Sequence, residues 1–246
     1  MILKEFGLQL FSVRDYTEKD FIGTLEKIAE MGYTSVEFAG FGDIPAKEMR
    51  AALDRLGLVS LGSHSGLDRL TGDNLKREVE YNAQIGSQYV ICPWAPMENR
   101  DDVLRLCETL AAASEAVCAA GMKLGYHNHN QEFGKDGDSY YFDIMMDTLS
   151  PDQLIMELDV FWSEYAGIDT KAYIRKYGPR CEIIHMKQIE NHETKKNVEL
   201  PRGMIDFAEL TKFAADCGAK HFIVEQEAYA SDSMESAKEN ADYLLK

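Results

Sequence analysis

Charged and imidazole side chains recur at the ends of short apolar segments in this sequence. Glu157 and Asp159 close one such segment, His185 and Lys187 close a second, and Glu225 follows a third. An unpaired charge is costly to bury, so these groups need partners inside the fold. Coordination of a divalent metal would supply one, because mixed oxygen and nitrogen ligands suit Mn, Mg, Co or Zn. The pattern therefore predicts a divalent metal site.

Other polar residues occupy comparable positions. His127 and His129 end another segment with Glu132 three residues on, while Glu37 and His64 lie on or at the end of earlier segments. Residues i and i+2 of a strand share a face, so His127 and His129 point the same way. Taken singly, a strand-end Asp is typical of a helix N-cap and a lone His of a hydrogen-bonded core residue. The joint pattern favours a metal site, although spacing leaves open which residues reach the metal.

A recurring unit positions these residues: a helical pattern, then a glycine, then a short apolar strand. A glycine just past a helix end closes the last turn in the left-handed conformation. Short apolar strands that follow helices are typical of βαβ units in a parallel sheet. Residues 154–158 and 6–10 are predicted as two further strands. The glycines of the six visible copies are Gly32, Gly57, Gly86, Gly121, Gly178 and Gly218.

Eight strands alternating with helices in 246 residues predict an α/β protein with a (β/α)8 barrel, forming one domain over residues 1–246. An open doubly wound sheet is the main rival. No Gly-x-Gly-x-x-Gly follows any predicted strand, which argues against it. Residues 188–204 are expected to lack regular structure and to form either an active-site lid or a solvated loop.

Composition limits the partners of the chain. Its 26 Lys and Arg against 42 Asp and Glu give a net charge of -16, which argues against nucleic-acid binding as the main function. The sequence shows no signal peptide and no membrane-spanning run. Five scattered cysteines without a Cys-x-x-Cys pair are typical of a reducing cytoplasm, where we expect the protein. The oligomeric state does not follow from the sequence.

Four motifs carry a resemblance that spans essentially the whole chain. They are residues 126–133 (YHNHNQEF), 157–162 (ELDVFW), 184–187 (IHMK) and 223–227 (IVEQE). In this order and spacing the chain resembles the xylose isomerase-like sugar phosphate isomerase/epimerase family of TIM barrels. The resemblance implies Glu132, Asp159, His185 and Glu225 as metal ligands, with Glu132 and Glu225 also transferring protons. His127 and His129 compete with Glu132 for the first ligand position.

The resemblance implies a metal-dependent isomerase or epimerase that removes a proton next to a sugar carbonyl through a metal-stabilised enediolate. Epimerases of the family often carry a His three residues after the ligand Asp. Trp162 stands there in this chain and argues against simple ketose 3-epimerase activity. The candidates for contacts with the substrate are Glu37, His64, His127, His129, Trp162 and Lys187.

Two other functions remain open at this stage. The same site would also support a dehydratase or lyase acting on a 3-keto sugar or cyclitol, since loss of a β-hydroxyl can follow the same proton removal. A non-catalytic sugar-binding barrel is the alternative from another class. No Arg-rich or Gly-rich phosphate cradle is evident, so the expected substrate is a non-phosphorylated sugar or cyclitol.

Overall fold

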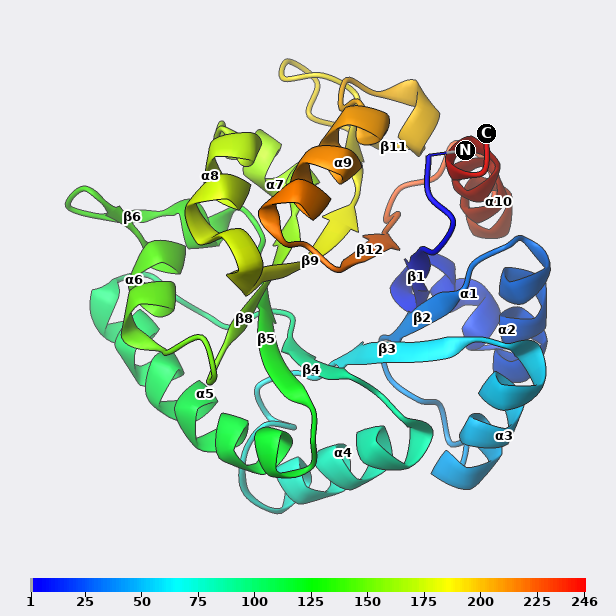
Figure 1. Cartoon of the computed structure of the whole chain (residues 1–246), viewed down its shortest axis with the longest axis horizontal. Helices are drawn as coiled ribbons and strands as arrows, with labels where there is room; N and C mark the ends of the chain where they lie inside the picture. The colour runs from blue at the N-terminus through cyan, green and yellow to red at the C-terminus, as the bar shows by residue number, and fades with distance from the viewer. Residues whose placement is uncertain (1) are drawn as a thin grey trace.

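Eight short strands close into a parallel barrel at the centre of the computed structural model, which describes residues 2–246 (Figure 1). Around the barrel the strands follow the order β1-β12-β9-β8-β5-β4-β3-β2. Every segment predicted as a strand contributes one, so the predicted (β/α)8 barrel is confirmed. Their bounds are β1 Gly7–Gln9, β2 Ser35–Phe38, β3 Val59–His64, β4 Tyr89–Cys92, β5 Lys123–His127, β8 Ile155–Asp159, β9 Cys181–Met186 and β12 His221–Val224.

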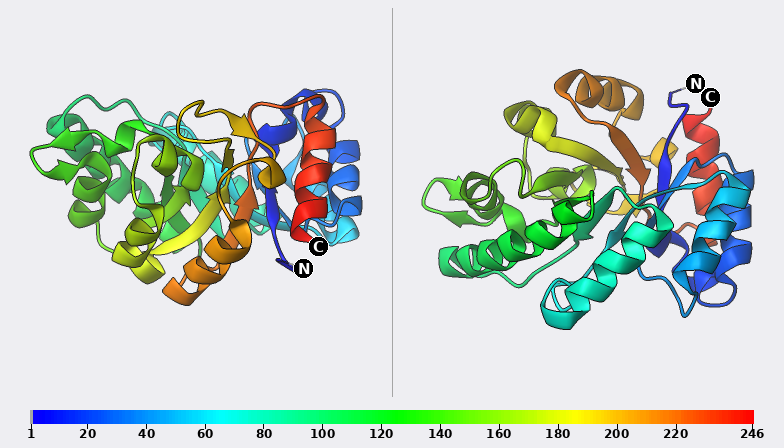
Figure 2. Two further views of the ribbon diagram at one scale, coloured as in Figure 1. Left: turned by 90° about the horizontal axis from the view of Figure 1, so that it is seen from above. Right: turned by 60° about the horizontal axis from the view of Figure 1, so that its bottom comes forward.

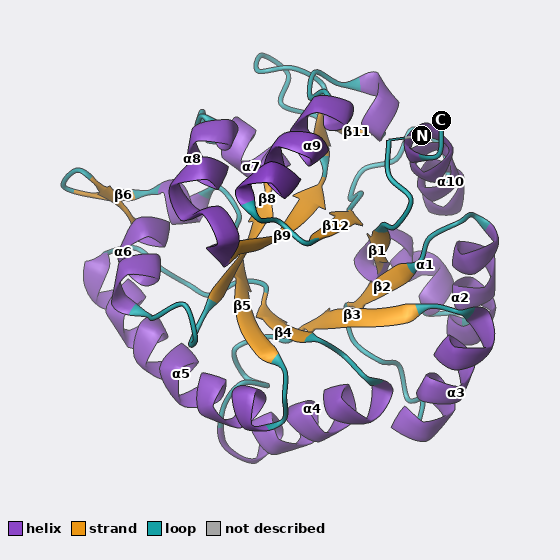
Figure 3. Ribbon diagram, in the orientation of Figure 1, coloured by secondary structure: helices purple, strands orange, loops and turns teal. Residues whose placement is uncertain are grey.

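Helices form a ring outside the barrel (Figure 3). The six glycines predicted to follow helices all have positive φ, and Gly57 and Gly86 end α3 and α4 in the left-handed conformation. The α-helices are α1 Arg14–Thr17, α2 Phe21–Glu30, α3 Ala46–Leu56, α4 Gly72–Ile85, α5 Arg100–Ala119, α6 Tyr141–Thr148, α7 Val160–Tyr165, α8 Thr170–Tyr177, α9 Phe207–Cys217 and α10 Ser233–Leu244. Short 3-10 helices are η1 Leu10–Val13, η2 Gln131–Phe133, η3 Gly178–Arg180 and η4 Leu200–Arg202.

The two ends of the described chain lie side by side (Figure 2). The backbone N–H groups of Ile2 and Leu3 both donate to the carbonyl of Leu244 at the end of α10. These bonds fasten the first residues to the last helix. Within residues 2–246, no helix has both the length and the apolar character needed to cross a membrane.

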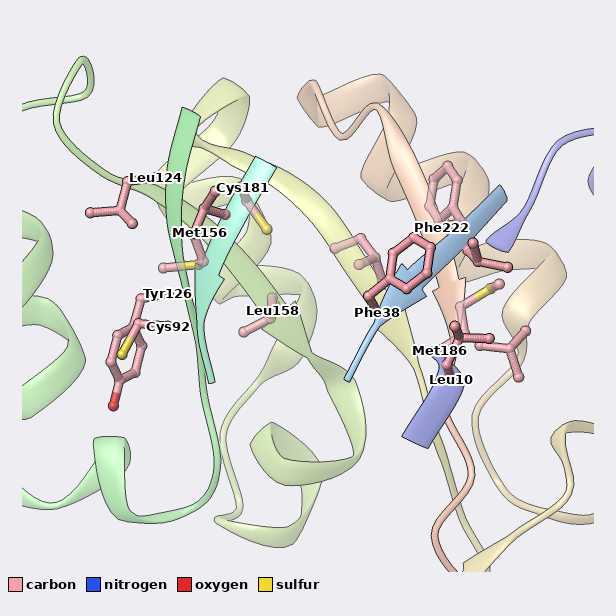
Figure 4. Packing of buried hydrophobic residues seen from close by; sticks show 14 of the residues in the cluster. Leu10, Phe38, Cys92, Leu124, Tyr126, Met156, Leu158, Cys181, Met186 and Phe222 are labelled. Carbon is pink, nitrogen blue, oxygen red and sulfur yellow. The ribbon is translucent and has the colours of Figure 1, made fainter. Parts of the chain in front are cut away.

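Alternation along the strands separates two cores. Met156 and Leu158 of β8 point outward and pack with other apolar side chains between barrel and helices, as do Leu124 and Tyr126 of β5 (Figure 4). Ile155 belongs instead to a separate apolar cluster. This period of two is what a strand buried on both faces requires. Hydrophobic side chains on both sides therefore fix the direction of every residue on these strands.

The separate cluster fills the barrel interior on the amino-terminal side of the charged strand ends, which we call its lower half. Gly125 of β5 makes room for it, because a Cβ atom there would lie 2.5 Å from Ile91 Cδ1 and 2.7 Å from Ile155 Cδ1. Side chains that interdigitate in layers are the usual filling of such barrels. The members are Leu61, Tyr89, Ile91, Ile155, Ile183 and Ile223.

The expectation that residues 188–204 lack regular structure was wrong. This segment contains a two-stranded antiparallel sheet, β10 Gln188–Ile189 with β11 Asn197–Val198. Gln188 is fully buried, and its side-chain amide donates to the carbonyls of Leu200 and Ile205. A second small sheet, β6 Lys135–Asp136 with β7 Ser139–Tyr140, follows β5. Hydrogen bonds of a buried amide therefore order this segment. It has no periodic apolar pattern from which its strands could be predicted.

Truncating the barrel interior should destabilise the fold. Ile155→Ala leaves a cavity that the facing Gly125 cannot fill, so we expect the free energy of unfolding to fall by about 2–5 kcal/mol. Urea denaturation followed by circular dichroism measures this change. Val59→Ala is the matched control, because Val59 is 47% exposed and its loss should change stability by less than about 0.5 kcal/mol. Equal effects of the two variants would contradict the layered interior.

Candidate metal centre

The charged side chains predicted to share a site converge at the carboxyl ends of the barrel strands. Glu157 and Asp159 come from β8, His185 and Lys187 from the end of β9, and Glu225 follows β12. All five are buried. They continue the inward-facing columns of their strands, two or four residues above the apolar interior layer. The site therefore lies at the mouth where barrel enzymes carry their chemistry.

Four side chains form what we call the outer set: His127, Asp159, His185 and Glu225. One nitrogen or oxygen atom of each lies within 4.8 Å of all the others. His127 Nε2 is 3.8 Å from Asp159 Oδ2, and His185 Nδ1 is 3.1 Å from Glu225 Oε2. Asp159 Oδ1 accepts the backbone N–H of Trp162 and caps α7, while Oδ2 is buried without a hydrogen-bond partner. A divalent cation would satisfy that oxygen, and the donor set fits one.

An inner set of two carboxylates, Glu37 and Glu157, contacts the imidazoles of His127 and His185 on the side opposite the outer carboxylates. His185 Nε2 lies 2.8 Å from Glu37 Oε2 and 3.0 Å from Glu157 Oε1. His127 Nδ1 lies 2.9 Å from the same Glu157 oxygen. Metal-binding histidines commonly give their second N–H to a carboxylate, which fixes the ring orientation and tautomer. The inner carboxylates are in place to do this for the outer set.

A second group, His64, His127, Glu157 and His185, is also compact enough to hold an ion. Its one carboxylate, Glu157, already has Oε1 within 3.0 Å of all three imidazoles. A nitrogen that donates to this oxygen has no lone pair left for an ion. The outer set, with two carboxylates and a location nearer the mouth, is therefore the better candidate.

Register shifts in two strands occur next to the inner carboxylates, Glu37 and Glu157. The register of β2 against β3 shifts between Val36 and Glu37, and that of β8 against β9 shifts between Met156 and Glu157. Bulges of this kind redirect side chains and are common beside active sites. Gln9 of β1 then donates its amide to Glu37 Oε2 at 2.8 Å. The glutamates thus reach the barrel axis from two strands with locally disturbed pairing.

Burial and neighbouring charges set the protonation of the outer set. Burial and the adjacent imidazoles lower the pKa of His127 well below its ordinary value, which keeps this ring neutral and able to ligate. Burial opposes a proton on His185, but the inner carboxylates raise its pKa well above the ordinary value. Burial raises the pKa of Asp159 to about 7, although Lys187 acts in the opposite direction. A metal must therefore displace protons from His185 and Asp159.

Glu132, which the resemblance implies as a ligand, lies in η2 outside the outer set. Tyr126 and Gln131 donate to its Oε1 at 2.9 and 3.1 Å, and the backbone N–H of His129 donates to its Oε2 at 2.7 Å. Burial raises the pKa of Glu132. Both oxygens are engaged within the loop after β5, and His127 completes the outer set.

Lys187 is fully buried beside the outer set. Its Nζ lies 2.9 Å from Glu227 Oε2 and 3.7 Å from both Asp159 Oδ2 and Glu225 Oε2. Burial opposes the charge, but these carboxylates raise the pKa of Lys187, so its side chain is an ammonium ion. The ammonium also faces the ring of Trp162, 5.1 Å from the ring centre.

Three of the four ring side chains predicted to touch the substrate lie outside the outer set: His64 ends β3, His129 follows β5 and Trp162 lies in α7 after β8. The rings of His129 and Trp162 lie 5.2 Å apart, and burial lowers the pKa of His129 to about 4. His129 Nδ1 and Trp162 Nε1 are buried without a hydrogen-bond partner. Each unpaired buried group costs about 1–3 kcal/mol, which a substrate oxygen would recover.

Glu157, which the sequence pattern groups with Asp159 without a separate role, contacts three imidazoles. The available signal was its place two residues before Asp159 on the same face of one strand. Glu37, predicted to contact the substrate, lies beneath the imidazoles, where it reaches His185 and His64. Sequence alone does not distinguish a carboxylate that contacts a metal or substrate from one that orients a neighbouring imidazole.

Comparison with known proteins identifies a matching family. The model of the family described as xylose isomerase-like TIM barrel matches residues 25–246. No curated protein matches the sequence at a significant level.

Solved structures superpose on nearly the whole chain. Two proteins of Parabacteroides distasonis ATCC 8503, each described as a sugar phosphate isomerase/epimerase, are 26% and 25% identical with TM-scores of 0.82 and 0.81. The alignments cover 98% and 99% of this chain and 93% and 98% of theirs. The 3-keto-D-glucoside 4-epimerase of E. coli, 14% identical with a TM-score of 0.75 over 99% of both chains, shares the fold.

Metal affinity should rise with pH. Below about pH 7 an incoming cation must displace a proton from Asp159 as well as one from His185, and above it only the latter. We expect the association constant for Mn to increase about tenfold or more per pH unit between pH 6 and 8, most steeply at the acidic end. Isothermal titration calorimetry in buffers of different ionisation enthalpy counts the released protons. Binding that releases none would contradict this protonation pattern.

Proposed function

This chain belongs to the xylose isomerase-like TIM barrel family, and we propose that it is a divalent-metal-dependent enzyme that isomerises or epimerises a small sugar. The observation that carries the proposal is the outer set, in which two imidazoles and two carboxylates converge at the barrel mouth. The two Parabacteroides proteins match along nearly their whole length. Their description as sugar phosphate isomerase/epimerase supports the proposal.

We assign His127, Asp159, His185 and Glu225 as the metal ligands. The unpaired Asp159 Oδ2 and the neutral His127 ring support this choice. Glu132 has a different role in the proposal, because its three hydrogen bonds fix the loop that follows β5. The mixed nitrogen and oxygen ligands suit Mn, Co or Zn, with Mg less favoured by the imidazoles.

A divalent cation at the outer set would supply Lewis-acid chemistry, acidifying the C–H bond of the hydroxyl-bearing carbon next to a sugar carbonyl. We assign Glu225 as the base for that proton. Burial opposes its ionisation, but Lys187 and His185 lower the pKa of Glu225, so it is a carboxylate at neutral pH. Return of the proton to the former carbonyl carbon, with transfer of the hydroxyl proton to the former carbonyl oxygen, completes an isomerisation.

Epimerisation through two carboxylates would need Glu132 as the second proton carrier. Its oxygens accept three hydrogen bonds, so it would have to release at least one of them first. A single base is sufficient for isomerisation, and also for elimination of a β-hydroxyl. On this observation we keep dehydration of a keto sugar or cyclitol as the second candidate function.

The surroundings of the outer set favour an uncharged substrate. Three carboxylates lie within 4 Å of the Lys187 ammonium, so it offers no excess positive charge to a phosphate. The free Trp162 Nε1–H is a donor, and the free His129 Nδ1 donates or accepts according to its tautomer, so both suit sugar hydroxyls. We therefore propose a non-phosphorylated sugar or cyclitol as substrate, with His64 beside it at the mouth.

Deuterium exchange tests this function without knowledge of the exact sugar. The protein with Mn is incubated in D2O with ketoses, keto sugars and cyclitols, free and phosphorylated, and proton NMR follows each carbon next to a carbonyl. We expect Mn-dependent exchange on at least one unphosphorylated compound. The double variant Asp159→Ala/His185→Ala should lose this exchange by at least about a hundredfold, because it removes half of the outer set.

The matched control is Asp43→Ala/His192→Ala, the same two substitutions at exposed positions, which should exchange like the wild type. Loss of a β-hydroxyl accompanying exchange would select the dehydratase. Exchange that survives the double variant would contradict the assigned site. Sugar binding without exchange, unaffected by chelators, would identify a non-catalytic sugar-binding barrel instead.

A further inference from the structure

Lys187 is an unusual residue for a barrel interior, because a lysine is almost never fully buried unless it is paired. Its ammonium is surrounded by Asp159, Glu225 and Glu227 and lies against the rings of Phe161 and Trp162, at 5.6 and 5.1 Å from their centres. Aromatic faces stabilise such a cation. The pocket is therefore built around a positive charge.

The position of that charge relative to the outer set is specific. Nζ lies at the same distance, 3.7 Å, from Asp159 Oδ2 and from Glu225 Oε2. These are the oxygens nearest the imidazole nitrogens of His127 and His185 in the outer set. A cation held by the same oxygens would repel the ammonium strongly at this range in a low-dielectric interior.

Glu227 offers the ammonium another partner. Its Oε2 is already the nearest carboxylate oxygen, at 2.9 Å, and its side chain is 34% exposed at the mouth. Glu227 lies two residues beyond Glu225 in the segment that follows β12, and the carboxylates of both lie within 4 Å of Lys187 Nζ. The flexible stem of a lysine can follow this carboxylate while its head remains paired.

We propose that Lys187 is the built-in counter-ion of the metal centre: its ammonium and a divalent cation compete for Asp159 and Glu225, and Glu227 holds the ammonium once the cation binds. This inference rests on the proposed metal site. Without the cation, Lys187 neutralises two buried carboxylates that would otherwise repel each other. The lysine thus stabilises the metal-free fold and, for the same reason, weakens metal binding.

The experiment is a calorimetric titration of Mn into metal-free wild type and Lys187→Met, with thermal unfolding measured for both. We expect Lys187→Met to bind Mn about tenfold or more tightly, since the competing charge is gone. Its metal-free form should melt at a lower temperature than the wild type, and saturating Mn should raise its melting temperature by more. A lysine that served packing alone would change stability without tightening Mn binding.

Two further variants control the result. Lys123→Met removes a lysine paired with Glu182 away from the barrel mouth, and its Mn affinity should equal that of the wild type. Glu227→Gln removes the alternative partner of the ammonium, so it should weaken Mn binding, the opposite sign to Lys187→Met. This variant also tests the proposal if Lys187→Met does not fold.

The outcomes separate the two proposals. If the wild type binds no Mn, Co or Zn, the metal centre itself is refuted. If the wild type binds Mn and both Lys187→Met and Glu227→Gln bind it with unchanged affinity, the metal centre stands and the counter-ion role is refuted. Weaker Mn binding by Lys187→Met would also overturn the proposal, since the ammonium would then support the ion.

Discussion

Neutralisation of buried carboxylates is the constraint on which the upper half of this barrel depends. Glu37, Glu157, Asp159 and Glu225 all lie within one connected group and are almost inaccessible to water. Two imidazoles resolve much of the conflict because each is shared, with one nitrogen facing the inner carboxylates and the other facing the outer ones. Removing one partner from such a group leaves an uncompensated charge, which is strongly destabilising. His185, whose pKa the inner carboxylates raise, supplies a compensating positive charge, whereas the neutral His127 hydrogen-bonds to Glu157 through Nδ1 and places Nε2 near Asp159.

The apolar layer at the amino-terminal ends of the strands stabilises the barrel beneath these buried charges. Ile155, Ile183 and Ile223 belong to a dry apolar layer, and the next inward-facing residue on each of their strands is charged or imidazole. Outward-facing side chains of the same strands pack against the helices, so a strand cannot turn without exposing apolar surface. Hydrophobic packing on two faces therefore holds the polar layer in place, which is what a site of fixed geometry needs.

Much of this organisation could be predicted from the sequence because it depends on local periodicity. Glycines after helices marked six of the strands, and the period of two placed Glu157 with Asp159 on one face. Asp159 combines features of two interpretations, since Oδ1 caps α7 while Oδ2 lies near His127 in the outer set that we propose binds a metal. Such division of one carboxylate between two roles has no signature in the sequence.

What the sequence did not reveal depends on side-chain contacts that leave no periodic pattern along the chain. The hydrogen bonds that occupy Glu132, and so favour His127 for the outer set, arise from the folding of one loop. The buried amide of Gln188 organises the segment after β9 through bonds to residues 12 and 17 positions away. The position of Lys187 between two carboxylates likewise follows from the pairing of β8, β9 and β12.

Diffraction at the manganese absorption edge from crystals soaked in Mn tests the central claim most directly. The account predicts one anomalous peak, bounded by His127 Nε2, Asp159 Oδ2, His185 Nδ1 and Glu225 Oε2. A peak among His64, His127 and Glu157, a site ligated by Glu132, or the absence of any peak at the barrel mouth would contradict it.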